Sequence, residues 1–359
     1  MVTNNTTLKC LILKSNALGD DGAFGIAVDL SVNTSLTSLS LAFNNIHHEG
    51  IANIVEALKV NTTLRNLNIS GNKFGVDGAY QIASLLENNS TLKKLNLSAS
   101  DLNDVGLHKI LQSLEKNTTL KELKLQNLDN DINNSVEYLV FLLKTKCHLT
   151  KLNLRFNLFT PQNLSLLIET LRHSTTLTSV DLSGQNKFTL EKAEEIESVI
   201  QTNSTLTSLS LNDNNIDDAI CQPIIRGLCC NTSLRELHLS GNQVYDIQGL
   251  LGHLHKNSTL TLLNLKDNKK FNRDDNNLVC SFMAINKTLS HDLGLIAKWP
   301  RSHESLDIVE QKEIEELLHV LRIYLPIDLQ VQSITLLLKI KKYKKYKKAK
   351  KNVITNALY

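Results

Sequence analysis

The hydrophobic residues of this chain recur with a period of about 28 residues. Each period opens on a leucine, usually after Thr or Ser, and ten of these leucines begin the pattern Leu-x-x-Leu-x-Leu, with an occasional Ile or Val. The opening leucines are Leu8, Leu36, Leu64, Leu92, Leu120, Leu149, Leu177, Leu206, Leu234, Leu260 and Leu289, the last of which lies out of register by one residue. A period this regular predicts a stack of ten or eleven similar units.

Each unit changes from a period of 2 to a period of 3.6. In the second unit, alternation places Leu39 and Leu41 on one face of a short strand. The segment that follows carries Ile51, Ile54 and Leu58 on one face of a helix. A single strand and helix cannot bury these faces alone, so neighbouring units must stack to form one continuous core.

Two asparagines punctuate most units. The first follows the strand, where its amide is expected to satisfy backbone groups in the turn; these are Asn16, Asn44, Asn72, Asn157, Asn186, Asn214, Asn242 and Asn268, while Ser100 and a late Asn130 depart from the pattern. The second ends the helix, as at Asn61 and Asn203, and also forms an N-x-Ser/Thr sequon. Glycosylation is the alternative for these sequons, but the N-terminus shows no signal peptide, which favours a structural role.

This pattern resembles the ribonuclease-inhibitor type of leucine-rich repeat over about residues 5–295. The resemblance implies an α/β solenoid in the form of a horseshoe, with parallel strands on the concave face and helices on the convex face. We expect the repeat domain to occupy residues 1–300. Residues 301–338 predict a helical C-terminal cap, because an open end of a solenoid exposes apolar surface. Its apolar side consists of Ile314, Leu317, Leu318, Leu321 and Tyr324.

A basic tail is expected over residues 339–359. The net charge of the chain is only +3, and nine lysines lie in this tail: Lys339, Lys341, Lys342, Lys344, Lys345, Lys347, Lys348, Lys350 and Lys351. Such a run is typical of a solubilising tail, of contact with an anionic membrane, of nuclear import or of nucleic-acid contact. The sequence alone leaves these alternatives open.

The sequence contains no motif that indicates catalysis. Walker A, GxGxxG, HExxH, GxSxG and CxxC patterns are all absent. Six scattered cysteines have no disulfide-framework spacing, which favours a reduced, cytoplasmic protein. The nearest approach to a metal site is the set Cys229, Cys230, His253 and His255, which we interpret as helix-end residues without a ligand. We therefore expect no metal, no cofactor and no small-molecule substrate.

The candidate site is a basic patch on the concave face. Strand alternation directs many cations of the first six units outward, among them Arg65, whereas the later units present more acids. Six of the cations lie on adjacent strands and form the predicted basic patch: Lys93, Lys94, Lys121, Lys124, Lys151 and Arg155. Such a patch favours a protein partner with an acidic surface. Phe43 and Phe156, at strand ends, are candidate anchors for that partner, and packing of their rings into the turn is the alternative.

We therefore predict a non-catalytic scaffold that binds a macromolecular partner on its concave face. One alternative is a secreted effector of an intracellular bacterium that acts on a host protein, which the uniform repeats and the abundance of Lys, Asn and Ile suggest. Another is a GTPase activator, because Ran GTPase-activating proteins look similar in fold and use an arginine in an N-terminal strand–helix loop. Here the loops 14–22, 42–50, 70–78 and 98–106 contain no arginine, and the tail is basic where that family's is acidic.

Overall fold

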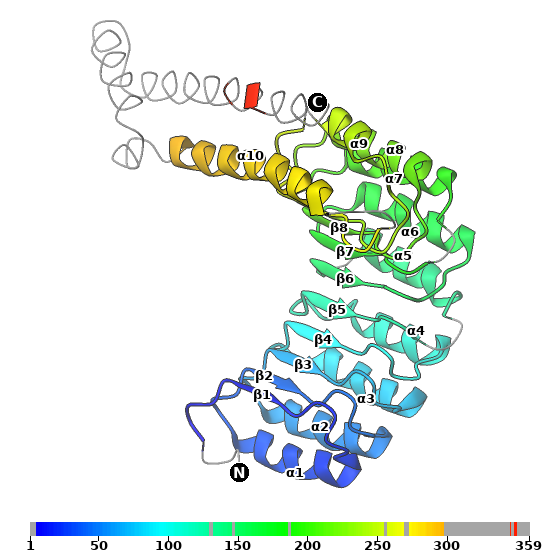
Figure 1. Ribbon diagram of the computed structural model, residues 1–359. Coiled ribbons are helices and arrows are strands. Elements are labelled where there is room, and N and C mark those ends of the chain that lie inside the picture. The colour runs from blue at the N-terminus through cyan, green and yellow to red at the C-terminus, as the bar shows by residue number, and fades with distance from the viewer. Residues whose placement is uncertain are drawn as a thin grey trace, which may run out of the picture.

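The computed structural model describes residues 5–128, 132–145, 148–185, 188–254, 257–268 and 273–297, together with Lys345, Lys348 and Ala349. In these residues ten strands alternate with ten helices, and the strands form one parallel sheet in chain order from β1 to β10. Figure 1 shows a curved solenoid with the strands along its inner side and the helices outside. The predicted α/β leucine-rich-repeat solenoid is thereby confirmed.

All ten strands are three residues long. They are β1 (Cys10–Ile12), β2 (Ser38–Ser40), β3 (Asn66–Asn68), β4 (Lys94–Asn96), β5 (Glu122–Lys124), β6 (Lys151–Asn153), β7 (Ser179–Asp181), β8 (Ser208–Ser210), β9 (Glu236–His238) and β10 (Leu262–Asn264). The helices are α1 (Gly19–Val32), α2 (His48–Val60), α3 (Gly75–Asn88), α4 (Asp104–Ser113), α5 (Ser135–Thr145), α6 (Pro161–His173), α7 (Leu190–Thr202), α8 (Asp218–Leu228), α9 (Ile247–Leu254) and α10 (Arg273–Ala297).

The middle residue of each strand faces the core. Leu39, Leu67 and Leu95 are paired in register across β2, β3 and β4, and all three are buried. The residues on either side point outward to the concave surface, as the period of 2 predicts. The core is filled by these leucines and by the apolar stripes of the helices. The outward side chains of the strands therefore do not contribute to the core.

The turn asparagines connect each unit to the one before it. The buried side chain of Asn44 accepts the N–H of Asn16 at 2.8 Å and donates to the carbonyl of Leu13 at 2.8 Å. Asn72 repeats both contacts one unit later, with the N–H of Asn44 and the carbonyl of Leu41. This ladder confirms the role that the sequence predicts for these asparagines.

In the seventh unit the predicted turn residue was wrong. Gln185 occupies the place that we expected Asn186 to fill, and its longer amide still reaches the carbonyl of Leu154 at 3.2 Å. Asn186 and Asn130 lie outside the described residues. Ser100 is too short to reach a neighbouring unit and donates to the carbonyl of Leu97 within its own turn.

Most helix-ending asparagines are buried and use both ends of the side-chain amide. The amide nitrogen of Asn117 donates to the carbonyls of Leu86 and Asn89 at 2.7 and 3.1 Å. Its oxygen accepts the N–H groups of Thr119 and Leu120 at 3.0 and 2.8 Å. A glycan would replace one of the two hydrogens that this nitrogen donates and would have no room at a buried side chain, so the folded solenoid explains the sequon at Asn117 by structure rather than by modification.

Acidic residues in the first turn of some helices bind the start of the next helix. The Asp20 carboxylate accepts the N–H groups of His47 and Gly50 at 2.8 and 2.9 Å. Burial opposes ionisation of Asp20, but the hydrogen bonds from His47 and Gly50 outweigh it and lower the pKa of this carboxyl. Asp104 and Asp218 make the corresponding contacts to the starts of α5 and α9.

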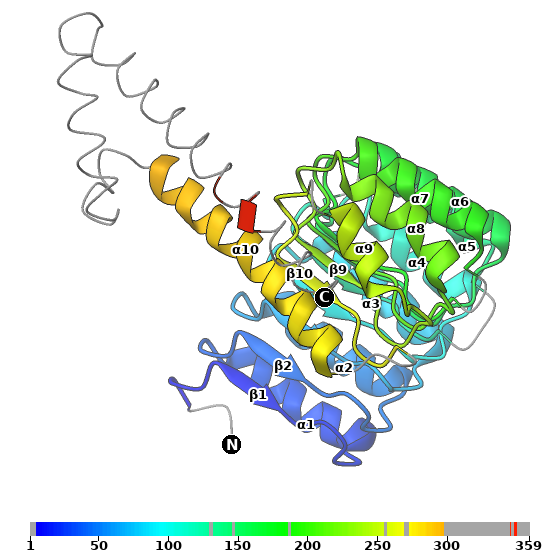
Figure 2. The same ribbon diagram turned by 45° about the horizontal axis from the view of Figure 1, so that its top comes forward.

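The last described helix departs from the repeat. We expected an out-of-register unit to open at Leu289, but α10 continues unbroken through this residue to Ala297. Asn286 holds the helix-ending place and its nitrogen still donates to the carbonyl of Leu260 at 2.7 Å. Its buried oxygen has no partner, because the N–H groups that such an oxygen accepts in other units belong here to a continuing helix. Figures 1 and 2 show α10 projecting away from the end of the sheet.

The cap predicted over residues 301–338 lies outside the described residues and stays a prediction. The same holds for the tail, of which only Lys345, Lys348 and Ala349 are described, as helical. Among the described helices none combines the length and the apolar character needed to cross a membrane.

The asparagine ladder can be tested at Asn117. Its replacement by Ala leaves buried backbone carbonyls and N–H groups without partners, so the free energy of unfolding should fall by about 1–3 kcal/mol. Urea denaturation followed by circular dichroism measures the change. Thr118→Ala, at the exposed neighbouring residue, is the matched control and should alter stability by less than about 0.5 kcal/mol. Equal effects of the two substitutions would contradict a structural role for this asparagine.

Candidate functional site on the concave face

The fold brings the six residues of the predicted basic patch onto three adjacent strands. Lys94, Lys124 and Lys151 lie within β4, β5 and β6, and Lys93 and Lys121 directly precede the first two of these strands. Arg155 lies two residues beyond β6. Neighbouring strands of a sheet are about 4.8 Å apart, so these cations share one continuous stretch of the concave wall.

Glu122 lies at the centre of this patch. It is paired in register with Lys94 on one side and Lys151 on the other. Its carboxylate forms ion pairs with Lys94 at 3.1 Å and with Lys124 at 3.4 Å. Burial disfavours the charged carboxylate, but the hydrogen bonds and charges of Lys94 and Lys124 outweigh burial and lower the pKa of Glu122. Two of the six cations are therefore partly neutralised within the patch.

Arg155 is also paired, but across a longer span. Its guanidinium contacts the Asp213 carboxylate at 2.6 Å, two units further along the chain. The guanidinium carbon of Arg155 also lies 4.4 Å from the centre of the Phe156 ring. That ring occupies the space where a side chain at Gly184 would be, and Gly184 also has a positive φ of 70°. A larger residue at this position would displace the ring and break the bridge.

The remaining cations of the patch make no ion pair in the described part of the chain. Lys121 donates to the carbonyls of Thr118 and His148 at 3.2 and 3.3 Å, which holds its ammonium at the rim of the face. Neither Lys93 nor Lys151 has an acidic partner among the described residues. Exposed Arg65 occupies the place before β3 that Lys93 and Lys121 occupy before β4 and β5. Strand alternation predicted Arg65 on the concave face, but Arg65 was not among the six cations of the predicted basic patch.

The two halves of the concave face differ in charge. Acids predominate beyond the sixth unit, where Asp181 and Glu236 lie in β7 and β9 and Asp213 follows β8. Asn153 donates to Asp181 at 3.2 Å, so the boundary between the halves is itself hydrogen-bonded. The concave face is therefore more basic along β3–β6 and more acidic along β7–β9.

The two predicted aromatic anchors share one arrangement. The Phe43 ring lies over Gly71, as the Phe156 ring lies over Gly184. Phe43 remains 49% exposed, with Lys14 at 5.1 Å from the ring centre. Both interpretations of Phe43 therefore hold in part, because one side of its ring packs on the backbone and the other side is accessible.

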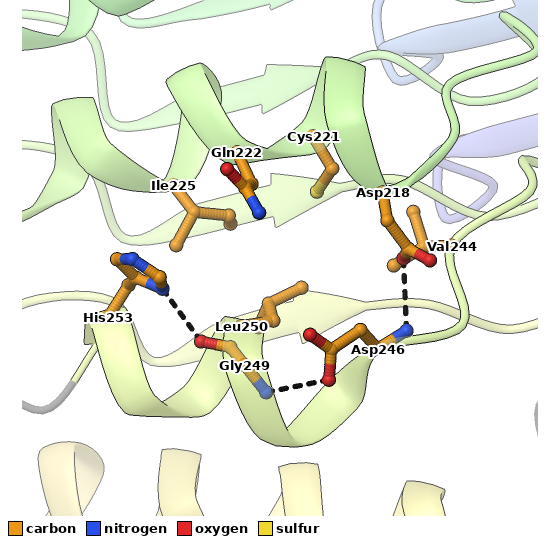
Figure 3. Close-up of a pocket in the computed structure, with 9 residues that line it drawn as sticks. All are labelled: Asp218, Cys221, Gln222, Ile225, Val244, Asp246, Gly249, Leu250 and His253. Atoms are coloured by element: carbon orange, nitrogen blue, oxygen red, sulfur yellow. Dashed lines mark hydrogen bonds between the residues drawn. The ribbon is translucent and has the colours of Figure 1, made fainter.

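The convex side carries hollows between neighbouring helices, and one of about 330 Å³ is lined among others by Tyr80, Asp104 and His108 of α3 and α4. Figure 3 shows a small cavity between α8 and α9, lined among others by Cys221, Leu250 and His253. Its volume is about 20 Å³, which is room for one water molecule. Burial, with a contribution from Asp218 and Asp217, raises the pKa of Cys221 to about 12, so this thiol is not a nucleophile at neutral pH.

The residues weighed as a metal site do not converge. The Cys229 thiol donates to the backbone carbonyl of His253 at 3.3 Å, and the His253 ring contacts the carbonyl of Gly249 at 2.7 Å. His255 lies outside the described residues. No group of three or more potential metal ligands is found in the part of the chain that the structure describes.

A buried lysine that the sequence did not single out lies between two convex helices. Lys192 of α7 is 5% exposed and forms an ion pair with Glu195 at 2.9 Å. Its ammonium also contacts the hydroxyl of Ser165 on α6. Because the charge is paired and its surroundings are packed, we interpret this cluster as a link between the helices.

Comparison with known proteins assigns the class. A model of the TMOD/LMOD leucine-rich domain matches residues 45–163. A general leucine-rich-repeat model matches residues 4–27, 32–55, 202–224 and 230–246. The chain is a leucine-rich-repeat protein. Its placement in the ribonuclease-inhibitor subtype stays a prediction.

No curated protein matches this sequence. Among solved structures, the leucine-rich repeat-containing protein LegL7 from Legionella pneumophila shares 20% identity over 71% of this chain and 82% of its own, with a TM-score of 0.48. Leiomodin-1 Actin-Binding Site 2 shares 18% identity over 50% and 86%, with a TM-score of 0.33. The tropomodulin C-terminal domain of Caenorhabditis elegans shares 13% over 50% and 90%, with a TM-score of 0.32.

The charge network around Glu122 predicts a reversal of its pKa shift. With Lys94 and Lys124 both replaced by Met, only the effect of burial remains, so the pKa of Glu122 should rise above the ordinary glutamate value instead of lying below it. Titration of the side-chain carboxyl carbon by NMR measures this. Lys59→Met on α2, which removes an unrelated ion pair with Glu56, should leave Glu122 unchanged.

The lowered pKa of Glu122 also makes the stability of the protein depend on pH. A carboxyl with a lowered pKa in the folded state stabilises the protein above its unfolded pKa, and this contribution is lost as the pH falls through the folded value. If the pKa of Glu122 is unchanged when Lys94 and Lys124 are both Met, the assigned ion pairs with these lysines are contradicted.

Proposed function

We propose that this protein is a non-catalytic scaffold whose concave face binds a protein partner with an acidic surface. The observation that carries the proposal is the concentration of cations on β4, β5 and β6, on a wall whose outward side chains do not contribute to the core. Complementary charge accelerates encounter and fixes the register of a partner more than it adds affinity. The acids beyond the sixth unit would set the direction in which the partner lies.

A binding role is also favoured by the shape of the surface. A specific protein interface buries about 800 Å² on each partner, and a broad curved wall supplies such an area more readily than a small convex cavity does. Leucine-rich repeats serve this purpose by stacking units that expose a wide concave surface. The six sequence-predicted cations are the residues that we assign to it.

The cytoplasm is the proposed location, and two further functions stay proposals from the sequence alone. The tail at 339–359 is proposed to contact an anionic membrane or an import receptor. Its deletion should redistribute a fluorescent fusion in cells, and an unchanged distribution would exclude both. The alternative that the protein is a bacterial effector acting on a host protein fails if the tagged protein stays inside the producing cell during infection.

The concave site is tested by neutral substitutions borrowed from neighbouring strands. Lys94→Asn, Lys124→Asn and Lys151→Ser install the residues found at the same register in β3, β4 and β7. The immobilised triple variant should lose the proteins that the unmodified protein retains from cytosol. A matched control neutralises Lys59, Lys109 and Lys144 on the convex helices and should retain them. Retention of the same proteins by both variants would remove the concave patch from consideration.

A further inference from the structure

The residue directly before each strand is here called the rim position. In five units it is a threonine: Thr37, Thr150, Thr178, Thr207 and Thr261. Each hydroxyl donates to the backbone carbonyl of the preceding unit's rim residue, at distances between 2.9 and 3.1 Å. Threonine at this position therefore adds one hydrogen bond between successive units.

The other five units carry a cation at the rim position: Lys9 and Arg235 stand singly, and the remaining three belong to consecutive units. Their rim residues are Arg65, Lys93 and Lys121, which we call the rim triad. The backbone does not require the change, because the N–H groups of all three residues still pair with the preceding unit, at 2.8, 2.7 and 2.8 Å. Three like charges on adjacent strands repel one another, and the threonine hydrogen bond is lost. Lys121 regains backbone hydrogen bonds through its ammonium, but no acid among the described residues pairs with any of the three charges.

The acid that directly follows Lys121 in the chain does not neutralise the triad. Glu122 is engaged by Lys94 and Lys124, and no residue of the rim triad forms an ion pair in the described part of the chain. The backbone carbonyls that accept from Lys121 position its ammonium but leave its charge in place. The triad is thus an uncompensated row of three positive charges about 10 Å long, since strands lie about 4.8 Å apart.

We infer that the rim triad binds a linear acidic segment, in which Asp or Glu side chains alternate with other residues along an extended chain. This rests on the proposed function and names the chemistry of the partner. An extended chain presents every second side chain on one face, about 6.6–6.8 Å apart, so two or three alternating carboxylates match the length of the row. The amide nitrogens of Asn68 and Asn96 on the strands beside the triad donate to no described residue, and they are available to a peptide carbonyl.

A peptide fits this surface better than a nucleic acid does. Single-stranded nucleic acids are bound by aromatic platforms beside a basic groove. The triad is flanked in β3 and β4 by Asn66, Asn68, Asn96 and Lys94, and both concave phenylalanines lie beyond the opposite ends of their strands.

The role of the rim triad is tested by exchanging its cations for threonine, the residue at the rim position of five other units. Arg65→Thr, Lys93→Thr and Lys121→Thr together install the residue that other units carry at this position, so the fold should be retained, as thermal unfolding would verify. The probe is a fluorescein-labelled peptide of five Glu-Ser repeats, with five Gln-Ser repeats as the uncharged control. We expect the unmodified protein to bind only the acidic peptide, and the triple variant to bind it at least about tenfold more weakly. The matched control is Arg235→Thr, the same exchange at the rim of β9, which should change affinity less than about twofold.

Each remaining outcome identifies which idea has failed. Undiminished binding by the triple threonine variant, with loss of binding in the Lys94→Asn, Lys124→Asn and Lys151→Ser variant, would overturn the rim triad and leave the concave site intact. Absence of acidic-peptide binding to the unmodified protein would overturn the triad as a peptide site, while partner capture still tests the concave face. Tighter binding of a fluorescein-labelled deoxythymidine decamer than of the acidic peptide would assign the row to nucleic acid and overturn the inference.

Discussion

The structure depends on the pairing of buried backbone groups where each strand turns into a helix and each helix returns to a strand. These turns lie inside the stack, so their N–H and C=O groups cannot reach water and must find partners in the protein. Asparagine meets this need because a single short side chain both donates and accepts. Asn44 and Asn117 each connect their own unit to the preceding one in this way. The repeat length stays close to 28 residues because these ladders close only when successive units are in register.

The outward residues of the strands can vary because they do not hold the stack together. The core leucines and the two ladders hold the stack together, and the outward residues of the strands are constrained by neither. Charge can accordingly accumulate on one part of the wall without cost to the core. The rim position is an exception, because a threonine there also contributes a hydrogen bond, and its replacement by a cation has a structural cost that a strand residue does not incur.

The strands and the turn contacts could be predicted from the sequence because the leucine and asparagine patterns that encode them are local. The opening leucines predicted all ten strands, and the turn asparagines predicted the backbone contacts that they make. Features that depend on three-dimensional neighbours could not be predicted. Gln185 replaces an asparagine by reaching further, and α10 continues through Leu289 although the segment carries the usual helix-ending sequence. The six cations were placed correctly on adjacent strands, but the central position of Glu122 and the reach of Arg155 to Asp213 depend on side-chain conformation.

In a solenoid each unit ordinarily touches only its immediate neighbours, so bending at one junction is independent of bending at the next. The bridge from Arg155 to Asp213 spans the seventh unit and ties the sixth to the eighth, with the Phe156 ring lying on Gly184 beneath it. The contact therefore crosses two junctions between units, and it does so at the boundary between the basic and the acidic halves of the concave face.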